Sequence, residues 1–317
     1  MRELADTIER WRARGDRVAL ATVVATRRSA PRPVGAKLVV SEQGELFGSV
    51  SGGCVESEVA LIAGEVIADG APRLLTYGIE DELAWSVGLP CGGEIDVFVE
   101  RFEGELPEEP SVTLTVLDGE RAGERLEAEI PAGPSRVLEV EGAQVFAEVL
   151  GPPPRLLVVG AIDTAEELAR AAKALGWRTA VIDPRAALAT RERLPSPDEL
   201  TVAWPDELEA DCDTAVVVLT HEDRLDVPAL TKALASDAFY VGAMGSRRTQ
   251  AKRRERLLEA GLGEEQLERL AGPAGLDLGA HTPAEMAVSI LAEVLAVRAG
   301  RDGGRLAARS GPIHVRA

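Results

Sequence analysis

Three consecutive prolines, Pro152–Pro154, constrain the fold of this chain most strongly. Consecutive prolines form a stiff extended segment, and they cannot enter the interior of a sheet because each lacks an N–H group. The hydrophobic pattern also changes at this point, which predicts a linker at residues 151–154. The length of 317 residues suits two domains, since domains usually hold about 100–200 residues each. We therefore expect domains at residues 1–150 and 155–300, followed by a tail at residues 301–317.

The second half alternates strands with helices. A continuous apolar run at residues 155–160 predicts a buried strand, and it is followed by a helix at 164–175 and a strand at 179–183. The alternation continues to a long helix at 283–299, which opens on the capping box Thr-Pro-Ala-Glu. This pattern predicts an α/β fold with a doubly wound, Rossmann-like parallel sheet.

The first half predicts a smaller α+β domain. Residues 102–148 are acidic and broken by Gly and Pro, which indicates short strands. We expect helices at 1–14 and 55–69, and strands at 17–26, 37–41, 45–50, 74–77, 95–100 and 112–117.

Two of the three cysteines, Cys54 and Cys91, adjoin glycine pairs, namely Gly52-Gly53 and Gly92-Gly93. Glycine pairs let a backbone approach a ligand and turn its N–H groups outward. Cys54 is expected in the first turn of its helix, where the helix dipole favours a thiolate or another anion. The alternative is a tight turn in which Cys54 packs as a small apolar residue. Two cysteines without a nearby His do not make a zinc site.

Two segments concentrate positive charge in an otherwise acidic chain. The loop that contains Arg32 and ends at Lys37 could clamp a phosphate, or it could simply be solvated. A second turn follows the strand expected at 238–241 and opens a basic helix, which makes it a candidate anion site. Its candidate residues are Gly242, Gly245, Ser246, Arg247 and Arg248.

The turn at Gly160 lies where a dinucleotide-binding Gly-x-Gly-x-x-Gly would lie, and Asp183 lies where a ribose-binding acid would lie. The glycine pattern fails, because Ile162 and Ala165 replace the second and third glycines. A branched side chain at 162 would obstruct a pyrophosphate. We therefore expect a Rossmann-like fold in which NAD(P) binding is doubtful.

The composition excludes several classes of protein. The net charge of −18 argues against nucleic-acid binding and against a polybasic membrane anchor. Three cysteines in 317 residues do not form a disulfide framework. Neither a signal peptide nor a membrane-spanning stretch is expected, so the cytoplasm is the expected location.

Several segments in this order resemble the XdhC/CoxI family, the accessory factors of molybdenum hydroxylases such as xanthine dehydrogenase. The most specific are Ser-Gly-Gly-Cys-Val-Glu at 51–56 and Gly-Ala-Met-Gly-Ser-Arg-Arg at 242–248. The others are residues 28–37, 88–93, 183–187 and 278–285. The chain departs from the family at Ile162, where many members keep a glycine, and at His281, where an arginine is expected.

The resemblance implies a protein that binds molybdenum cofactor (molybdopterin), supports or protects its sulfurated form and delivers it to an apo molybdenum hydroxylase. It also implies a cysteine desulfurase as a second partner, a homodimer, and a cofactor chaperone more than an enzyme. Cys54 and Cys91 match the family's motif, and they would hold the molybdenum. The turn at Arg247, or the loop with Arg32 and Lys37, would hold the phosphate. The alternatives are a sulfurtransferase with a persulfide on Cys54 and an NAD(P)-dependent oxidoreductase.

Overall fold

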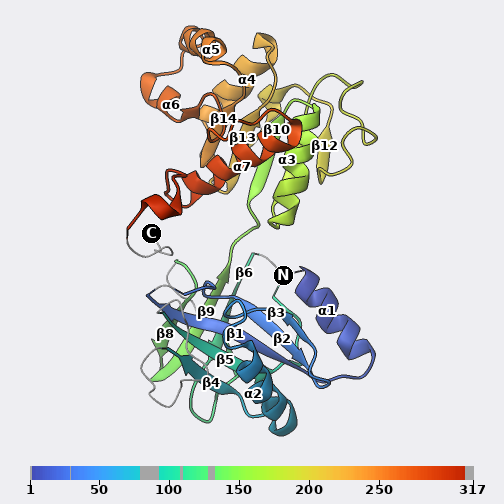
Figure 1. Ribbon diagram of the computed structural model, residues 1–317, viewed down its shortest axis with the longest axis vertical. Coiled ribbons are helices and arrows are strands. Elements are labelled where there is room, and N and C mark those ends of the chain that lie inside the picture. Colours follow the sequence, from blue (N-terminus) through green and yellow to red (C-terminus); the bar gives the residue numbers. More distant parts are fainter. Residues whose placement is uncertain (1, 29, 79–92, 108–109, 128–132, 311–317) are drawn as a thin grey trace. The chain divides into compact units, whose positions relative to one another are not determined.

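The computed structural model describes residues 2–28, 30–78, 93–107, 110–127 and 133–310 (Figure 1). It separates into two compact units, with the division between Gly151 and Pro152. The predicted cysteine segment around Cys91 and Gly92 lies outside the described residues. No helix in the described part of the chain is long and apolar enough to cross a membrane.

The first unit is built on a five-stranded antiparallel sheet of order β3-β2-β1-β5-β4. Helix α2 packs on one face and helix α1 on the other, because alternate strand residues point to opposite faces. A four-stranded antiparallel sheet of order β7-β6-β9-β8 forms a second layer. The elements are α1 (Arg2–Ala13), β1 (Val18–Arg27), β2 (Lys37–Ser41), β3 (Leu46–Gly48), α2 (Glu56–Asp69), β4 (Arg73–Tyr77), β5 (Glu94–Arg101), β6 (Ser111–Val116), β7 (Arg125–Leu126), β8 (Arg136–Val140) and β9 (Ala143–Leu150).

The second unit confirms the predicted Rossmann-like fold. Its six strands are parallel and run in the order β12-β11-β10-β13-β14-β15. Numbered along the chain this order is 3-2-1-4-5-6, the arrangement of dinucleotide-binding domains, with its switch point between β10 and β13. The strands are β10 (Arg155–Val159), β11 (Arg178–Ile182), β12 (Glu199–Thr201), β13 (Thr214–Val218), β14 (Tyr240–Ala243) and β15 (Leu270–Ala271).

Helices cover both faces of this sheet (Figure 1). Helices α3 and α7 bury alanine and leucine side chains against one face, and α4, α5 and α6 cover the other. The capping box at Thr282 is formed as expected, because its hydroxyl accepts from Glu285 N–H and the Glu285 carboxylate accepts from Thr282 N–H. The helices are α3 (Asp163–Ala174), α4 (Asp223–Leu234), α5 (Arg247–Glu259), α6 (Glu264–Glu268) and α7 (Pro283–Arg298), with short 3-10 turns η1 (Pro205–Glu207) and η2 (Leu306–Ala308).

Candidate functional site

The Gly-Gly-Cys turn connects β3 to α2, and it uses its own backbone donors internally. Six consecutive N–H groups, from residue 50 to residue 55, donate hydrogen bonds to side chains of the same turn. The donors and acceptors are Val50 and Ser51 to Glu56 Oε1, Gly53 to Glu56 Oε2, Gly52 to Ser49 Oγ, and Cys54 and Val55 to Ser51 Oγ. The anion cradle predicted at Gly52-Gly53 is therefore filled by the protein's own carboxylate and hydroxyls.

Glu56 carries the charge that holds this turn. Its carboxylate accepts three backbone hydrogen bonds and two more from the hydroxyls of Ser49 and Ser51. Partial burial would raise the pKa of Glu56, but the hydrogen bonds from Ser51, Ser49 and the backbone outweigh it and lower the pKa to about 2. Glu56 is therefore ionised at neutral pH, and the sequence analysis missed its role.

Cys54 lies just outside the helix in which it was expected. Helix α2 begins at Glu56 and Val55 is its N-cap, so Cys54 precedes the helix and does not lie in its first turn. The expectation was wrong because the Ser51 hydroxyl accepts from the N–H groups of Cys54 and Val55 and keeps these residues in the turn. The Cys54 side chain is half-buried, packs partly against the core beneath α2, and is a free thiol.

Lys37, one of the two predicted phosphate-binding residues of the first unit, does not lie beside Cys54. Lys37 opens strand β2, is buried, and lies 2.6 Å from Glu148 Oε1 through its Nζ. It shares a face of the sheet with Leu20 and Val39, whereas Cys54 packs on the α2 face. Arg32 lies in the exposed loop before β2. Lys37 and Cys54 therefore lie on opposite faces of the sheet.

Gly160 and Asp183 meet at the carboxyl edge of the Rossmann-type sheet. Gly160 has a φ of 112°, and a Cβ there would lie 2.7 Å from Thr220 Cγ2, so the turn requires glycine. The Asp183 carboxylate is fully buried and accepts from Ala161 N–H at 2.8 Å. The Asp183 carboxylate is thus hydrogen-bonded to the turn on which a dinucleotide would bind. The side chain of Ile162 packs partly against the core.

Arg185 completes this arrangement, and the sequence analysis assigned it no role. Its backbone N–H and its guanidinium donate three hydrogen bonds to Asp183, and a further one reaches Glu222 at 2.7 Å. Burial would raise the pKa of Asp183, but the hydrogen bonds from Arg185 and Ala161 outweigh it and lower that pKa. The signal was present in Asp-Pro-Arg at 183–185, since an arginine two residues after a strand-ending acid can turn back onto it.

The second predicted anion-binding turn carries two arginines that form no ion pair with the described residues. Gly242 lies buried within β14, Gly245 forms the turn, and Ser246 is the N-cap of α5, accepting from Thr249 N–H. Arg247 and Arg248 open the helix and are exposed, and within the described part of the chain neither forms an ion pair. A helix start with two unpaired arginines can bind an anion.

A cavity of about 490 Å³ adjoins this helix start. Residues 273–280 form one wall and α7 another, and Arg247 and Asp277 are the charged side chains that line it in the described region. The wall is fixed to α7: Gly275 N–H donates to Glu293 Oε2 at 2.8 Å, and Ser289 Oγ donates to Leu276 O at 2.6 Å. The structure thus joins two separate motifs, 242–248 and 278–285, around one hollow.

The described residues contain no group of three or more His, Cys, Asp or Glu side chains that could hold a metal ion. The site features are a thiol on a locked turn in the first unit and an arginine-bearing cavity in the second.

Together these features define a two-domain protein whose Rossmann-type domain lacks the glycine pattern of dinucleotide-binding domains. The chain belongs to the XdhC/CoxI family. A model of the XdhC Rossmann domain matches residues 156–294, and a model of the XdhC and CoxI family matches residues 11–78.

Curated relatives agree with this assignment. The chain is 31% identical over 297 residues to the molybdenum cofactor insertion chaperone PaoD of Escherichia coli, covering 90% of this chain and 84% of the relative. It is 28% identical over 312 residues to a Bacillus subtilis protein named as a probable xanthine dehydrogenase subunit, covering 88% and 92%. A crystal structure described as a xanthine dehydrogenase from Bacillus halodurans shares the fold, with a TM-score of 0.73, 24% identity and coverage of 96% and 97%.

Proposed function

We propose that this protein binds molybdenum cofactor and delivers it to an apo molybdenum hydroxylase of the xanthine dehydrogenase type. The observation that carries the proposal is the 31% identity, across 90% of the chain, to a molybdenum cofactor insertion chaperone. The cofactor is cargo here. Its two ends differ in chemistry: a soft metal held by a pterin dithiolene, and a phosphate.

The Cys54 thiol is our candidate contact for the metal end, together with Cys91. Thiolate ligands suit soft metal centres. The locked turn supports this role, because a half-buried thiol on a fixed backbone loses little freedom when it binds. The backbone N–H groups of the turn are already bonded, so we assign the phosphate elsewhere.

Arg247 is our candidate for the phosphate end, with Arg248 beside it. Arg247 lines a cavity and has no ion-pair partner among the described residues, whereas Lys37 is buried against Glu148. Arg32 is exposed and remains a second candidate. Asp277 shares the cavity with Arg247 and would repel an anion there.

An anaerobic titration with molybdenum cofactor tests the proposal, with bound molybdenum and oxidised pterin fluorescence as readouts. The intact protein should bind one equivalent. Cys54→Ser and Arg247→Ala should each weaken binding, and Asp277→Asn should strengthen it. Cys212→Ser and Arg305→Ala change an exposed cysteine and an exposed arginine elsewhere, so they should bind like the intact protein. Absence of binding by the intact protein would overturn the proposal.

The same thiol supports a second candidate function, sulfur transfer, because Cys54 is free and half-exposed on its turn. A Cys54 thiolate would attack the terminal sulfur of a persulfide on a cysteine desulfurase. The donor's S–S bond would break, its thiolate would leave, and Cys54 would hold the persulfide. Mass spectrometry should then show one added sulfur on the intact protein and none on Cys54→Ser.

The client enzyme, the desulfurase and a homodimer are further parts of this proposal, and so is a cytoplasmic location.

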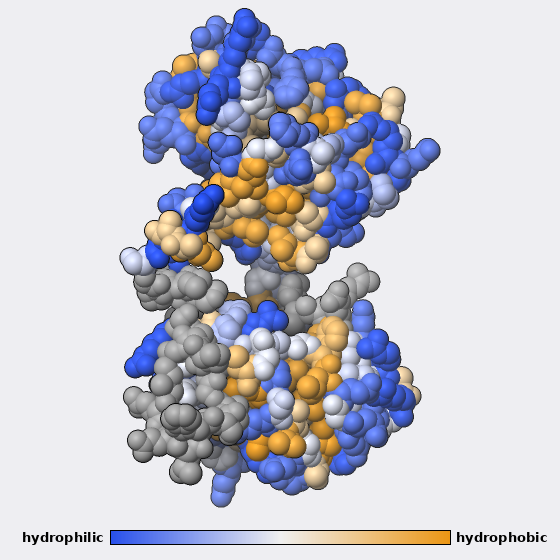
Figure 2. All heavy atoms as spheres, viewed as in Figure 1, coloured by the Kyte–Doolittle hydropathy of each residue, from blue (hydrophilic) through white to orange (hydrophobic). Residues whose placement is uncertain are grey.

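Figure 2 shows apolar residues gathered on the face of the second unit that α7 covers. Val288, Leu295 and Val297 on this helix are exposed, and such patches commonly bind other proteins. Light scattering of the protein alone would report the homodimer, and light scattering with added apo-hydroxylase or desulfurase would report each partner association.

A further inference from the structure

A buried ion pair joins two helices of the second unit near the turn that carries Arg247. Arg253 of α5 and Asp226 of α4 are each 2% exposed, and Arg253 Nη2 donates to Asp226 Oδ2 at 2.6 Å. The other carboxylate oxygen of Asp226 accepts a hydrogen bond from the Thr220 hydroxyl. The sequence analysis assigned no role to either member of the pair.

The Arg253 guanidinium also reaches the backbone at the carboxyl ends of two neighbouring strands. Nη1 donates to Met244 O at 3.1 Å, and Nη2 donates to Thr220 O at 3.4 Å. Met244 directly follows β14, and Thr220 lies two residues after β13. Carbonyl groups at the end of a strand have left the sheet's hydrogen-bond ladder, so they need other donors when they are buried. One buried guanidinium therefore fixes the backbone where both strands end.

Gln250 of α5 extends this network to the wall of the Arg247 cavity. Its Oε1 accepts from Arg253 Nη1 at 2.7 Å, and its Nε2 donates to Ala243 O at 2.9 Å. The same carbonyl accepts from Ala274 N–H at 3.0 Å, and Ala274 lies in the cavity wall at residues 273–280. The side chain of Gln250 thus connects Arg253 to the end of β14, on which both the turn and the wall depend.

Stability alone does not account for the buried pair. Arg253 Nε is buried and donates no hydrogen bond within the described part of the chain, and a buried donor without a partner is unfavourable. Apolar side chains of similar volume often replace a buried ion pair with equal or greater stability. An apolar pair, however, has no donor for the Met244 carbonyl. The directional hydrogen bonds of Arg253 therefore indicate a role in positioning.

We propose that Arg253 is a positioning residue for the anion-binding turn and acts through Met244 and Gln250. The inference rests on the proposed function, in which Arg247 contacts the phosphate of the cargo. Met244 and Arg247 both line the cavity, and Arg253 does not. Its bond to Met244 O holds the backbone from which Arg247 extends, so the turn loses less freedom when an anion binds.

The double variant Arg253→Met/Asp226→Leu tests this role, because it replaces the pair with apolar side chains and keeps the core filled. Its thermal unfolding midpoint should stay equal or rise. Its affinity for molybdenum cofactor should fall about three- to tenfold, the ordering cost of one side chain. Amide hydrogen exchange at residues 244–247 should rise in the protein without cargo. A stable double variant with native affinity and native exchange would overturn the proposal.

Gln250→Leu keeps the ion pair and removes the link to Ala243, so it tests the same role if the double variant does not fold. It should also weaken cofactor binding and raise exchange at residues 244–247. Native values of both in Gln250→Leu would show that the network does not hold the turn, and the proposal would be wrong.

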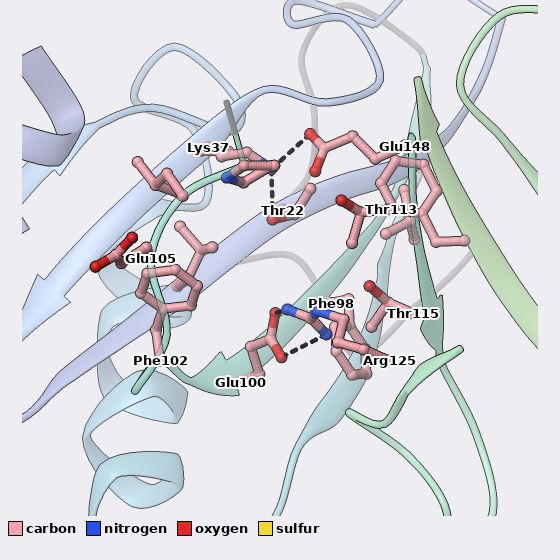
Figure 3. Close-up of a pocket in the computed structure, with 15 residues that line it drawn as sticks. Thr22, Lys37, Phe98, Glu100, Phe102, Glu105, Thr113, Thr115, Arg125 and Glu148 are labelled. Carbon is pink, nitrogen blue, oxygen red and sulfur yellow. Dashed lines mark hydrogen bonds and ion pairs between the residues drawn. The ribbon is translucent and has the colours of Figure 1, made fainter. Parts of the chain in front are cut away.

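The matched control is Arg125→Met/Glu100→Leu, which removes one arginine and one carboxylate from the first unit. This pair joins β7 to β5 with hydrogen bonds of 2.7 and 3.1 Å (Figure 3), and its loss should leave affinity and exchange at 244–247 unchanged. Arg247→Ala separates the two proposals. If Arg247→Ala weakens binding but Arg253→Met/Asp226→Leu does not, the proposed function stands and the positioning role is wrong. If Arg247→Ala binds like the native protein, the phosphate contact itself fails, and the positioning role toward the cargo fails with it.

Discussion

The most informative single residue in the first unit is Glu56, because its carboxylate accepts from three of the six backbone N–H groups in the turn that presents Cys54. The sequence singled out Cys54 correctly as a residue on a glycine-rich turn. It did not reveal that Glu56 and two serines would consume the turn's donors. Glycine pairs predict that N–H groups can turn toward a ligand, but they do not say whether a nearby side chain will take them first. Here the acceptors Ser51 and Glu56 lie within six residues of the donors they bond, so these nearby side chains take the N–H groups.

We expect Glu56→Gln to destabilise the first unit by about 2 kcal/mol at pH 7, because charge-assisted hydrogen bonds are lost from a partly exposed group. The pH dependence of this stabilisation follows from the pKa of Glu56, which is lowered to about 2 in the folded protein. The native carboxylate stabilises the fold above its unfolded pKa of about 4.3. This stabilisation disappears as the pH falls toward about 2. The difference in unfolding free energy between the two proteins should therefore shrink across that range.

Urea unfolding at several pH values measures this difference. Glu65→Gln is the matched control, because Glu65 is an exposed residue of the same helix with a single long contact to Arg73. It should change stability by less than about 1 kcal/mol. A Glu56→Gln effect that stayed constant from pH 7 to pH 3 would contradict the assignment of a native charge to Glu56.

At the scale of elements, the sequence predicted the parallel sheet well and the small antiparallel sheet poorly. Strand β10 and helix α3 carry strong local signals: a continuous apolar run, then a helical period. Strands β7 and β8 are short and partly exposed, and they depend on pairing with β6 and β9. Such strands are set by cross-strand contacts, which a local pattern does not contain.

The turn between β10 and α3 allows a prediction about dinucleotides. Asp183→Asn should destabilise the second unit by about 3 kcal/mol, because it removes the buried partner of the Arg185 guanidinium. Neither protein should bind NAD(P), since Asp183 bonds to Ala161 and Arg185 in place of a ribose. Thermal unfolding and a nicotinamide-cofactor titration check both statements. Saturable binding by the native protein would show that the internal bonds yield to a ligand.

The loop at residues 273–280 gives a prediction about the Arg247 cavity. Gly275 has a φ of 110°, and a Cβ there would lie 2.4 Å from Ser289 Oγ. Gly275→Ala should cost about 2–3 kcal/mol and displace this wall, since backbone strain adds to the clash. Gly279→Ala is the matched control: its φ is also positive, at 67°, but no atom lies within 4 Å of its Cβ. Amide hydrogen exchange at residues 275–278 should therefore rise more in the first variant. An equal increase in exchange in the two variants would show that the Ser289 side chain moves aside without destabilising the wall.

At the scale of the whole molecule, the chain combines two kinds of domain on either side of a proline segment. The sequence analysis set the linker at residues 151–154, and the compact units separate between Gly151 and Pro152. The linker prediction rests on the coincidence of a proline run with a change of hydrophobic period. What the sequence did not provide was the cavity beside the unpaired Arg247 in the second unit.

The proposed contacts lead to a prediction about the complete protein and its cargo. Cys54→Ser should lose about 10- to 100-fold in affinity for molybdenum cofactor, and so should Arg247→Ala, because one charge-assisted contact is worth about that much. Cys212→Ser and Arg305→Ala should bind as tightly as the native protein, because these residues are exposed and belong to no proposed contact. An anaerobic titration with bound molybdenum as the readout measures the four affinities. An unchanged affinity in Cys54→Ser would remove the thiol from the proposed contacts, and an unchanged affinity in Arg247→Ala would remove the arginine.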